Sequence, residues 1–527
     1  MKEQNTQDTM KHFSNFKLKV LAQSLLIGLI TGIVVVFYRI LLGKVANFRG
    51  DMFVTLKSSP IIFTVLWFAL LLLVGYLLGL LIEKVPMTKG SGIPQVQGAL
   101  IRKLKLNWLP ELIGKFFGGI IGPGLGLSLG REGPSVQLGA EIGLGVSKIF
   151  KRHDTEEKYL VTSGASAGLS AAFNAPLAGV VFSLEELHRN FTPVILLCVM
   201  ASSLTADFIS KTFLGVNPAF AFGEMKALPL DKYFHLIILG IITGVMGAIF
   251  NYCILKGQDA YKGVKNIKTR YKAMFPFLFV GILGFILPDM LGGGHGLVEK
   301  LNTQSFTLSI LLLFIVVKLV FTAICYGSGV PGGIFLPLLV IGALIGKSYG
   351  VIVTDYFGTP ESYALNFTIL AMAGYFTAIT RAPITGSILI LEMTNSFDHL
   401  LGLIVVAVVA YVVVDLLNVK SIYDYLLERI LDENKDKKPM RHKENKVIIE
   451  IPVAIGSRID GKLIKDIAWP EGCLIVGIER GGEQILPKGT TGLIQGDRLI
   501  ILTDEESAYD INHGLISMGE ECTDSLL

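Results

Sequence analysis

The chain has 527 residues, of which 51% are hydrophobic and 17% are charged. A soluble chain carries about 25% charged residues, so this composition excludes an ordinary soluble protein and predicts a polytopic membrane protein. The net charge of +4 is modest and its lysines and arginines gather in loops, which indicates membrane topology and not a nucleic-acid-binding face. The cysteines show no paired spacing, so we expect neither a disulfide nor a metal site from Cys198, Cys253, Cys325, Cys473 and Cys522.

The first four fifths of the chain predict membrane-spanning helices. Residues 1–16 are polar and are expected to stay in the cytosol, and the first apolar run is too long for a cleavable signal peptide. A full span needs about 20 residues. The runs near this length are Val20–Leu42, Ile61–Ile82, Val194–Phe213, Phe234–Leu255, Ser309–Cys325 and Leu400–Leu417.

Four further apolar runs are short and carry Gly or Pro. Such segments are typical of discontinuous helices that meet at a transport site. They are Pro94–Ile101, Pro134–Gly145, Pro176–Leu187 and Pro337–Ile345.

The distribution of lysine and arginine predicts the orientation. Basic loops occur at 102–105, 148–152 and 256–272, whereas Gly215–Tyr233 is far less basic. Cytoplasmic loops carry the excess of basic residues. We therefore expect both termini and the basic loops in the cytoplasm, and Gly215–Tyr233 outside.

Two motifs recur in the same order along the chain. Gly90–Pro94 (Gly-Ser-Gly-Ile-Pro) returns as Gly327–Pro331 (Gly-Ser-Gly-Val-Pro). An Ala-Pro motif, each time followed by a glutamate, occurs at Ala175–Gly179 with Glu185 and at Ala382–Gly386 with Glu392. Two ordered pairs of motifs predict an internal repeat.

The repeat divides a membrane domain of residues 17–430 into halves of about 17–214 and 231–427. If the loop between the halves is outside and the N terminus inside, the second half starts from the opposite face. This predicts an inverted repeat, in which a transport site lies near the midplane where the halves meet.

The composition changes after Asn418. Residues 431–445 read as a charged linker, and 446–527 as a small β-rich soluble domain. The strand-like runs are Val447–Val453, Cys473–Glu479 and Arg498–Thr503, with a hairpin turn expected at Gly481-Gly482.

A carboxylate stands out in the apolar, glycine-rich region 118–145. Glu132 lies in Gly-Arg-Glu-Gly-Pro (130–134), and an ionisable side chain at mid-bilayer costs roughly 3 kcal/mol or more, which marks it as functional. Pro94, Pro134 and Pro331 each begin or nearly begin a short helix behind glycines, and helix N-termini offer unpaired N–H donors to an anion. A carboxylate beside such donors suggests a gate that competes with an anion.

These motifs resemble the signatures of the CLC chloride channel and transporter family. The matching stretches are 90–94, 130–134, 173–179 leading to Glu185-Glu186, and Gly-Ser-Gly-Val-Pro-Gly-Gly-Ile-Phe-Leu-Pro at 327–337. The resemblance implies an all-α polytopic CLC fold with two inverted repeats and broken helices, assembled as a homodimer with one anion pathway per subunit. It implies a central chloride site formed by the hydroxyls of Ser91 and Tyr423 and the N–H groups of Ile334 and Phe335, with Tyr425 as the competitor of Tyr423.

The resemblance also implies a route for protons. Glu132 matches the gating glutamate, which occupies an anion position when ionised and swings away when protonated. Glu186 matches the internal proton-transfer glutamate of exchangers, and channel members usually have a non-acidic residue there. Glu185 is the alternative, although its repeat partner Glu392 favours a structural role.

Three stretches of the C-terminal domain, Gly456–Leu463, Ile475–Arg480 and Gly496–Leu502, resemble an RCK_C (TrkA C-terminal) domain. The resemblance implies a regulatory domain that dimerises and, in some members, binds cyclic di-AMP. A dimerisation module without ligand remains the alternative.

Together these features predict a chloride/proton antiporter and not an enzyme, in a bacterial plasma membrane, with chloride, protons, lipid and a second copy of the chain as partners, and with no cofactor. The alternatives are a passive voltage- or pH-gated chloride channel of the same fold and a ligand-sensing membrane receptor.

Overall fold

The computed structural model describes residues 2–189, 191–220, 222–223, 228–360, 363–435, 446–481, 483–504, 511, 514–515 and 518–519. The chain divides into two units: a membrane unit, Met1–Leu100 with Leu106–Ile430, and a C-terminal unit, Ile101–Lys105 with Leu431–Leu527. Residues 436–445 of the expected linker, Gly482 of the expected hairpin turn, Cys522, and 221 and 224–227 of the expected outer loop lie outside the described residues.

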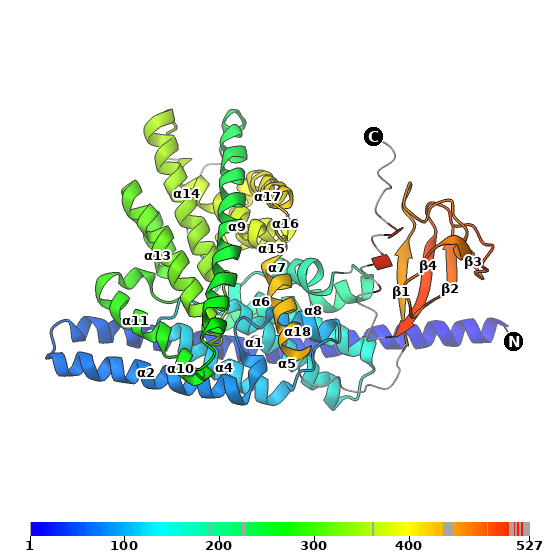
Figure 1. Ribbon diagram of the computed structural model, residues 1–527, viewed down its shortest axis with the longest axis horizontal. Helices are drawn as coiled ribbons and strands as arrows, with labels where there is room; N and C mark the ends of the chain where they lie inside the picture. The colour runs from blue at the N-terminus through cyan, green and yellow to red at the C-terminus, as the bar shows by residue number, and fades with distance from the viewer. Residues whose placement is uncertain are drawn as a thin grey trace. The chain divides into compact units, whose positions relative to one another are not determined.

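The membrane unit is helical, as predicted (Figure 1). Its first half contains α1 (Lys2–Leu56), α2 (Ile61–Lys84), α3 (Ile93–Leu100), α4 (Trp108–Gly124), α5 (Glu132–Ile149), α6 (Asp154–Phe173), α7 (Pro176–Phe182) and α8 (Pro193–Leu214). Its second half contains α9 (Phe234–Gly263), α10 (Thr269–Lys272), α11 (Phe275–Ile286), α12 (His295–Thr303), α13 (Leu308–Gly327), α14 (Phe335–Phe357), α15 (Ala364–Thr380), α16 (Pro383–Thr394) and α17 (Leu400–Leu416). The last helix, α18 (Ile422–Lys435), extends five residues into the segment expected to be a linker.

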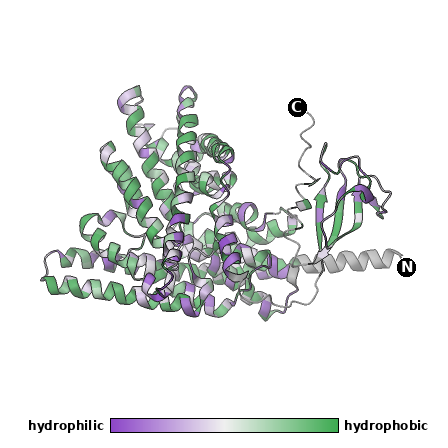
Figure 2. Cartoon of the chain, in the orientation of Figure 1, coloured by the Kyte–Doolittle hydropathy of each residue, from purple (hydrophilic) through white to green (hydrophobic). Residues whose placement is uncertain are grey.

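Among the described residues, eight helices are long and apolar enough to cross a membrane. Five of the six long apolar runs lie within one of them, and the sixth, Leu400–Leu417, extends one residue past a helix that ends at Leu416. The hydrophobic colouring of these helices is plain in Figure 2. The core of the unit is formed where α9, α13 and α14 lie side by side and where α5 packs on α6. The protein is therefore a multi-pass membrane protein.

The prediction of short helices is right for α3 and α7, which have 8 and 7 residues, and wrong for two others. α5 has 18 residues and α14 has 23. Their internal glycines are packing faces and do not end the helix. A Cβ on Gly139 would lie 1.9 Å from the Gly164 carbonyl oxygen, and one on Gly346 would lie 2.1 Å from the Phe367 carbonyl oxygen, so glycine lets the helix backbones approach.

The two halves repeat the same order of elements. The series from α2 through α3, α4, α5, α6 and α7 to α8 corresponds to the series from α11 through α12, α13, α14, α15 and α16 to α17. A short 3-10 turn follows the first helix of each series, at Pro86–Thr88 and at Pro288–Met290.

The first of the two motif pairs does not join equivalent positions. Gly90–Pro94 leads into α3, which begins at Ile93, whereas Gly327–Pro331 runs from the last residue of α13 into the loop before α14, so Pro331 stands four residues before its helix and does not begin it. The true counterpart of the first motif precedes α12. Gly90 and Gly92 have φ of 63° and 102°, and Gly292 and Gly294 have 66° and 92°. Both loops need this left-handed backbone, which favours glycine.

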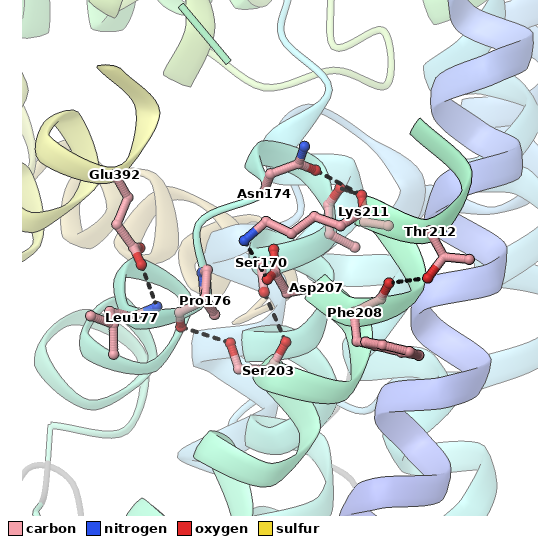
Figure 3. Close-up of polar contacts among 12 residues, drawn as sticks. Ser170, Asn174, Pro176, Leu177, Ser203, Asp207, Phe208, Lys211, Thr212 and Glu392 are labelled. Atoms are coloured by element: carbon pink, nitrogen blue, oxygen red, sulfur yellow. Dashed lines mark hydrogen bonds and ion pairs between the residues drawn. The ribbon is translucent and has the colours of Figure 1, made fainter. Parts of the chain in front are cut away.

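The Ala-Pro motifs do join equivalent positions, because Pro176 begins α7 and Pro383 begins α16. The glutamate that follows each motif, Glu185 or Glu392, accepts hydrogen bonds from backbone N–H groups at the start of the short helix in the other half. Glu392 accepts from Leu177 N (3.1 Å) and Ala178 N (2.7 Å), and the first of these bonds is drawn in Figure 3.

In the reverse direction, Glu185 accepts from Ile384 N (3.3 Å), Thr385 N (2.7 Å) and Thr385 Oγ1 (2.6 Å). Each carboxylate thus caps a helix N-terminus, where negative charge is favoured. This exchange of contacts supports the structural role expected for Glu185.

Two buried lysines form a second matched pair. Lys115 Nζ donates to the carbonyls of Thr88 (3.0 Å) and Gly90 (2.6 Å). Lys318 Nζ donates in the same way to Met290 (3.0 Å) and Gly292 (2.7 Å). Each ammonium group therefore fixes the loop that enters a short helix, α3 or α12.

The C-terminal unit has a four-stranded antiparallel sheet in the order β1-β4-β2-β3 (Figure 1). The strands are β1 (Lys446–Pro452), β2 (Cys473–Arg480), β3 (Glu483–Ile485) and β4 (Arg498–Asp504), close to the predicted runs. Ile478, Leu499 and Ile501 are buried in its core, as the alternation along β2 and β4 requires. The Arg480 guanidinium forms a bidentate pair with Asp497, with both distances 2.7 Å.

Candidate functional site

Three glycine-rich loops are tied together by backbone hydrogen bonds. Gly130 and Gly333 exchange two bonds, of 2.6 and 2.8 Å. Gly90 N donates to Gly329 O (3.1 Å), and Gly332 N donates to Gly90 O (3.0 Å). These loops lead into α3, α5 and α14, so the starts of three helices gather at one place, with their free N–H groups and the positive ends of their dipoles.

Ser91 and Glu132 lie at this place and are buried, at 1% and 0% exposure. Gly133 allows Ser91 to approach α5, because a Cβ there would lie 2.3 Å from Ser91 Oγ. Among the described residues, neither Ser91 Oγ nor either carboxylate oxygen of Glu132 has a hydrogen-bond partner. Arg131 Nε is 3.9 Å from Glu132 Oε1. The backbone N–H groups of Glu132 and Leu336 act on this carboxylate, and a buried carboxylate that no described side chain hydrogen-bonds is costly.

Tyr423, at the start of α18, is fully buried, and its hydroxyl finds no partner in the described part of the chain. The competitor Tyr425 is only partly buried, and its hydroxyl accepts a bond from Lys420 N at 3.4 Å. Of the two, Tyr423 alone has a hydroxyl that is buried and available.

Ile334 and Phe335 form the entry to α14, and both are fully buried. The Phe335 ring is held among three other rings, with centroids at 4.9 Å (Phe376), 5.2 Å (Phe173) and 6.5 Å (Phe182). This packing fixes the backbone whose N–H groups are expected to face chloride.

Glu186 lies in a single π-type turn, η2 (Ser183–His188), after α7. Its Oε1 accepts hydrogen bonds from Gln97 Nε2 (3.1 Å) and Ser421 Oγ (3.2 Å). Ser421 Oγ also accepts a hydrogen bond from Tyr423 N at 3.3 Å. The carboxyl group is therefore connected through one residue to the helix start that carries the Tyr423 hydroxyl.

Sequence reasoning missed several polar groups around these residues. Tyr326 is buried, and a Cβ on Gly90 would lie 3.3 Å from its hydroxyl oxygen. Gln97 and Ser421 contact Glu186. Tyr326 directly precedes a Gly-Ser-Gly motif, which is a local signal, whereas nothing in the sequence links Gln97 or Ser421 to Glu186.

Arg381, which follows α15, makes structural contacts. The Arg381 guanidinium pairs with Asp415 and lies 4.3 Å from the centroid of the Tyr411 ring. Among the described residues, no group of three or more His, Cys, Asp or Glu side chains could hold a metal ion.

Residues 74–415 match the family described as voltage gated chloride channel. The chain belongs to this family. It is 36% identical over 428 residues to the H(+)/Cl(-) exchange transporter ClcA of Vibrio cholerae, covering 79% of this chain and 90% of the relative. It is 34% identical over 424 residues to the ClcA of Salmonella newport, covering 79% and 89%.

Solved structures of CLC-type proteins are similar to this chain. The structure of a slow cyanobacterial Cl-/H+ antiporter has a TM-score of 0.76 and 32% identity, covering 79% of this chain and 99% of that one. A CLC-type fluoride/proton antiporter has a TM-score of 0.65 and 25% identity, covering 77% and 97%. Residues 448–512 match the TrkA-C domain. The CLC fold and the C-terminal resemblance are thus confirmed.

Proposed function

We propose that this protein is a chloride/proton antiporter of a bacterial plasma membrane. The observation that carries the proposal is the contrast between two buried carboxyl groups. Glu132 lies buried beside the helix starts that would bind an anion, with only Arg131 as its ion-pair partner among the described residues, and Glu186 is connected through Ser421 to the start of α18. Relatives named H(+)/Cl(-) exchange transporters, which match 79% of the chain, support the same activity.

In the proposed cycle, chloride is bound by the hydroxyls of Ser91 and Tyr423 and by the N–H groups of Ile334 and Phe335. Ionised Glu132 takes the place of an anion at the same donors. Protonation removes its charge, so the side chain leaves and chloride enters. Glu186 exchanges the proton with the cytosol. One carboxylate alternates with one anion, and this couples the two fluxes.

The assembly and orientation are part of the proposal. We infer a homodimer with one pathway in each subunit, embedded in lipid, with both termini in the cytoplasm. The domain limits proposed are 1–16, 17–430, 431–445 and 446–527. Cross-linking in intact cells and labelling of single introduced cysteines from either side of the membrane test these inferences.

The C-terminal domain is proposed to regulate transport from the cytosol, with a cyclic dinucleotide such as cyclic di-AMP as its ligand. The match to the TrkA-C domain supports a regulatory role. Calorimetry of the full-length protein with cyclic di-AMP tests the ligand, and an absence of binding heat favours a dimerisation module.

A flux experiment tests the antiporter. In liposomes that contain the purified protein, the reversal potential for chloride current should shift when a pH gradient is imposed, because each cycle moves protons. A reversal potential that ignores the pH gradient identifies a passive channel. Chloride flux no faster than in empty liposomes favours the receptor.

A further inference from the structure

Two charged residues next to Glu186 have no part in the cycle described above. Arg189 ends the π-type turn, and Asp424 lies in the first turn of α18. Arg189 has φ of 53° and ψ of 30°, a left-handed conformation that is uncommon outside glycine. Such a conformation persists where surrounding contacts hold it, and it gathers at functional sites.

The guanidinium group of Arg189 stands between two carboxylates. Its Nη2 is 2.7 Å from Asp424 Oδ1 and 3.7 Å from Glu186 Oε1. Its Nε donates to the Glu186 carbonyl oxygen at 3.3 Å. The same cation is therefore shared between an acid on α18 and the proton glutamate.

Exposure differs along this row of charges. The side chain of Glu186 is 4% exposed, that of Asp424 29%, and that of Arg189 45%. The row thus leads from solvent at the first turn of α18 to the buried carboxyl group. It is the one place near Glu186 where the described contacts join a buried acid to partly exposed charges.

The other groups around Glu186 are neutral or point elsewhere. α3 contributes the Gln97 amide, the residue before α18 contributes the Ser421 hydroxyl, and α18 itself contributes, nearby, the phenol of Tyr423. His188 follows two residues after Glu186, but its Nδ1 bonds Thr162 Oγ1 at 3.2 Å. Among the described ion pairs, Arg189 places a positive charge beside Glu186, and Asp424 shares that charge.

We propose that Arg189 and Asp424 form an electrostatic latch that sets the range of cytosolic pH over which Glu186 exchanges its proton. The inference rests on the proposed antiporter function. The Arg189 cation stabilises the ionised form of Glu186, whereas the Asp424 carboxylate holds that cation toward α18 and opposes this effect. Both residues act through Glu186 and are positioning residues.

The latch predicts opposite shifts for its two partners. Asp424→Asn should move the dependence of proton flux on cytosolic-side pH to lower pH. Arg189→Gln should move it to higher pH, because ionised Glu186 loses its cation. Each shift should be about 1 pH unit, the low end for an opposite charge within 4–6 Å. Arg189→Lys keeps the charge and should restore most of the wild-type profile.

A matched control lies on the same helix. Arg429 of α18 pairs with Asp259 of α9 at 2.8 Å, so Asp259→Asn also removes an ion pair that holds α18. It should leave the pH profile unchanged. A purely structural loosening of α18 would affect Asp259→Asn and Asp424→Asn alike and would move both profiles in the same direction.

The measurement uses the full-length protein in liposomes of fixed external pH and varied pH on the side of α18, with proton and chloride flux recorded together. Opposite shifts for Asp424→Asn and Arg189→Gln support the latch. Shifts in one direction, or none, in variants that still carry chloride overturn it. If wild-type protein moves chloride but no protons, the antiporter proposal fails and the latch fails with it. Wild-type coupling with unshifted variants defeats the latch alone.

Discussion

The two halves of the membrane unit share their scaffold and differ in their chemistry. The paired loops carry glycines of matching φ, Lys115 and Lys318 bind matching carbonyls, and Glu185 and Glu392 cap each other's helices. These residues occur twice because both halves need the same support.

The proposed transport residues occur once. Glu132 begins α5, whereas Phe335 begins the corresponding α14. Glu186 follows Glu185, but Met393 follows Glu392. A residue that the repeat preserves thus belongs to the frame, and a polar residue that it fails to preserve is a candidate for function. The predictions below test this distinction.

The largest effect is expected from Glu132→Gln, which removes an unmatched acid. The amide imitates the protonated carboxyl group but cannot release a proton, so proton-coupled transport should fall about 100-fold or more. Chloride flux should continue. Simultaneous recording of both fluxes in liposomes checks this, and proton transport at the wild-type ratio would contradict the role of Glu132.

The substitution Glu186→Met gives the first half the residue type that the second half has at the equivalent position, Met393. Proton movement should again fall about 100-fold, because the thioether cannot carry a proton, while chloride flux persists. Glu186→Gln is the polar control and should behave alike. Proton pumping that survives both changes would transfer the role to another acid, such as Glu185.

A smaller effect is expected for the matched acids. Glu185→Gln and Glu392→Gln each weaken one helix cap and should lower the free energy of unfolding by about 1 kcal/mol, the usual cost of a lost N-cap. The proton-to-chloride ratio should not change in either variant. Unfolding in detergent, followed by tryptophan fluorescence, measures the cost. Clearly unequal losses would count against the equivalence of the two positions.

The smallest effect is expected outside the repeat, at Asp497. Burial raises the pKa of this carboxyl group, but hydrogen bonds from Arg480 and from Ile494 N outweigh it, so the net pKa is lowered. A lowered pKa stabilises the fold above the unfolded value of about 3.9 and loses this contribution as pH falls through the folded value.

Hydrogen exchange of β4 in the full-length protein should therefore accelerate as the pH falls below about 4, after correction for the intrinsic exchange rate. In Asp497→Asn this extra acid dependence should be absent, because the amide does not titrate. If hydrogen exchange of β4 accelerated equally at low pH in both proteins, the Arg480–Asp497 ion pair would not be the cause of that acceleration.

Much of the fold could be predicted because long apolar runs and proline-headed helices are local signals. Five of the six long runs fall within spanning helices and the sixth exceeds its helix by one residue, and α7 begins at Pro176 as expected. The lengths of α5 and α14 could not be predicted, because glycine reads as a break until the neighbouring helix backbone is known. The Gly-Ser-Gly pair misled because its last glycine is left-handed in both loops (φ of 102° at Gly92 and 80° at Gly329), although the loops are not equivalent and Gly327 ends helix α13.

For the candidate site, family motifs brought attention to Ser91, Glu132 and Glu186, and the buried hydroxyl distinguishes Tyr423 from Tyr425. The contacts of Glu186 with Gln97, Ser421 and Arg189 could not be read from the sequence. Two of these partners are far from it along the chain or on another helix, and only the folded arrangement brings them together.

The exchanged caps at α7 and α16 also define the smallest part of the membrane unit that can stand alone. A fragment that ended after α8 would leave the N–H groups of Leu177 and Ala178 without the Glu392 carboxylate. A fragment that began at α9 would leave Ile384 and Thr385 without Glu185. Neither half can complete itself, so two separately made fragments should become stable only when they meet, as the subunits of an obligate heterodimer do.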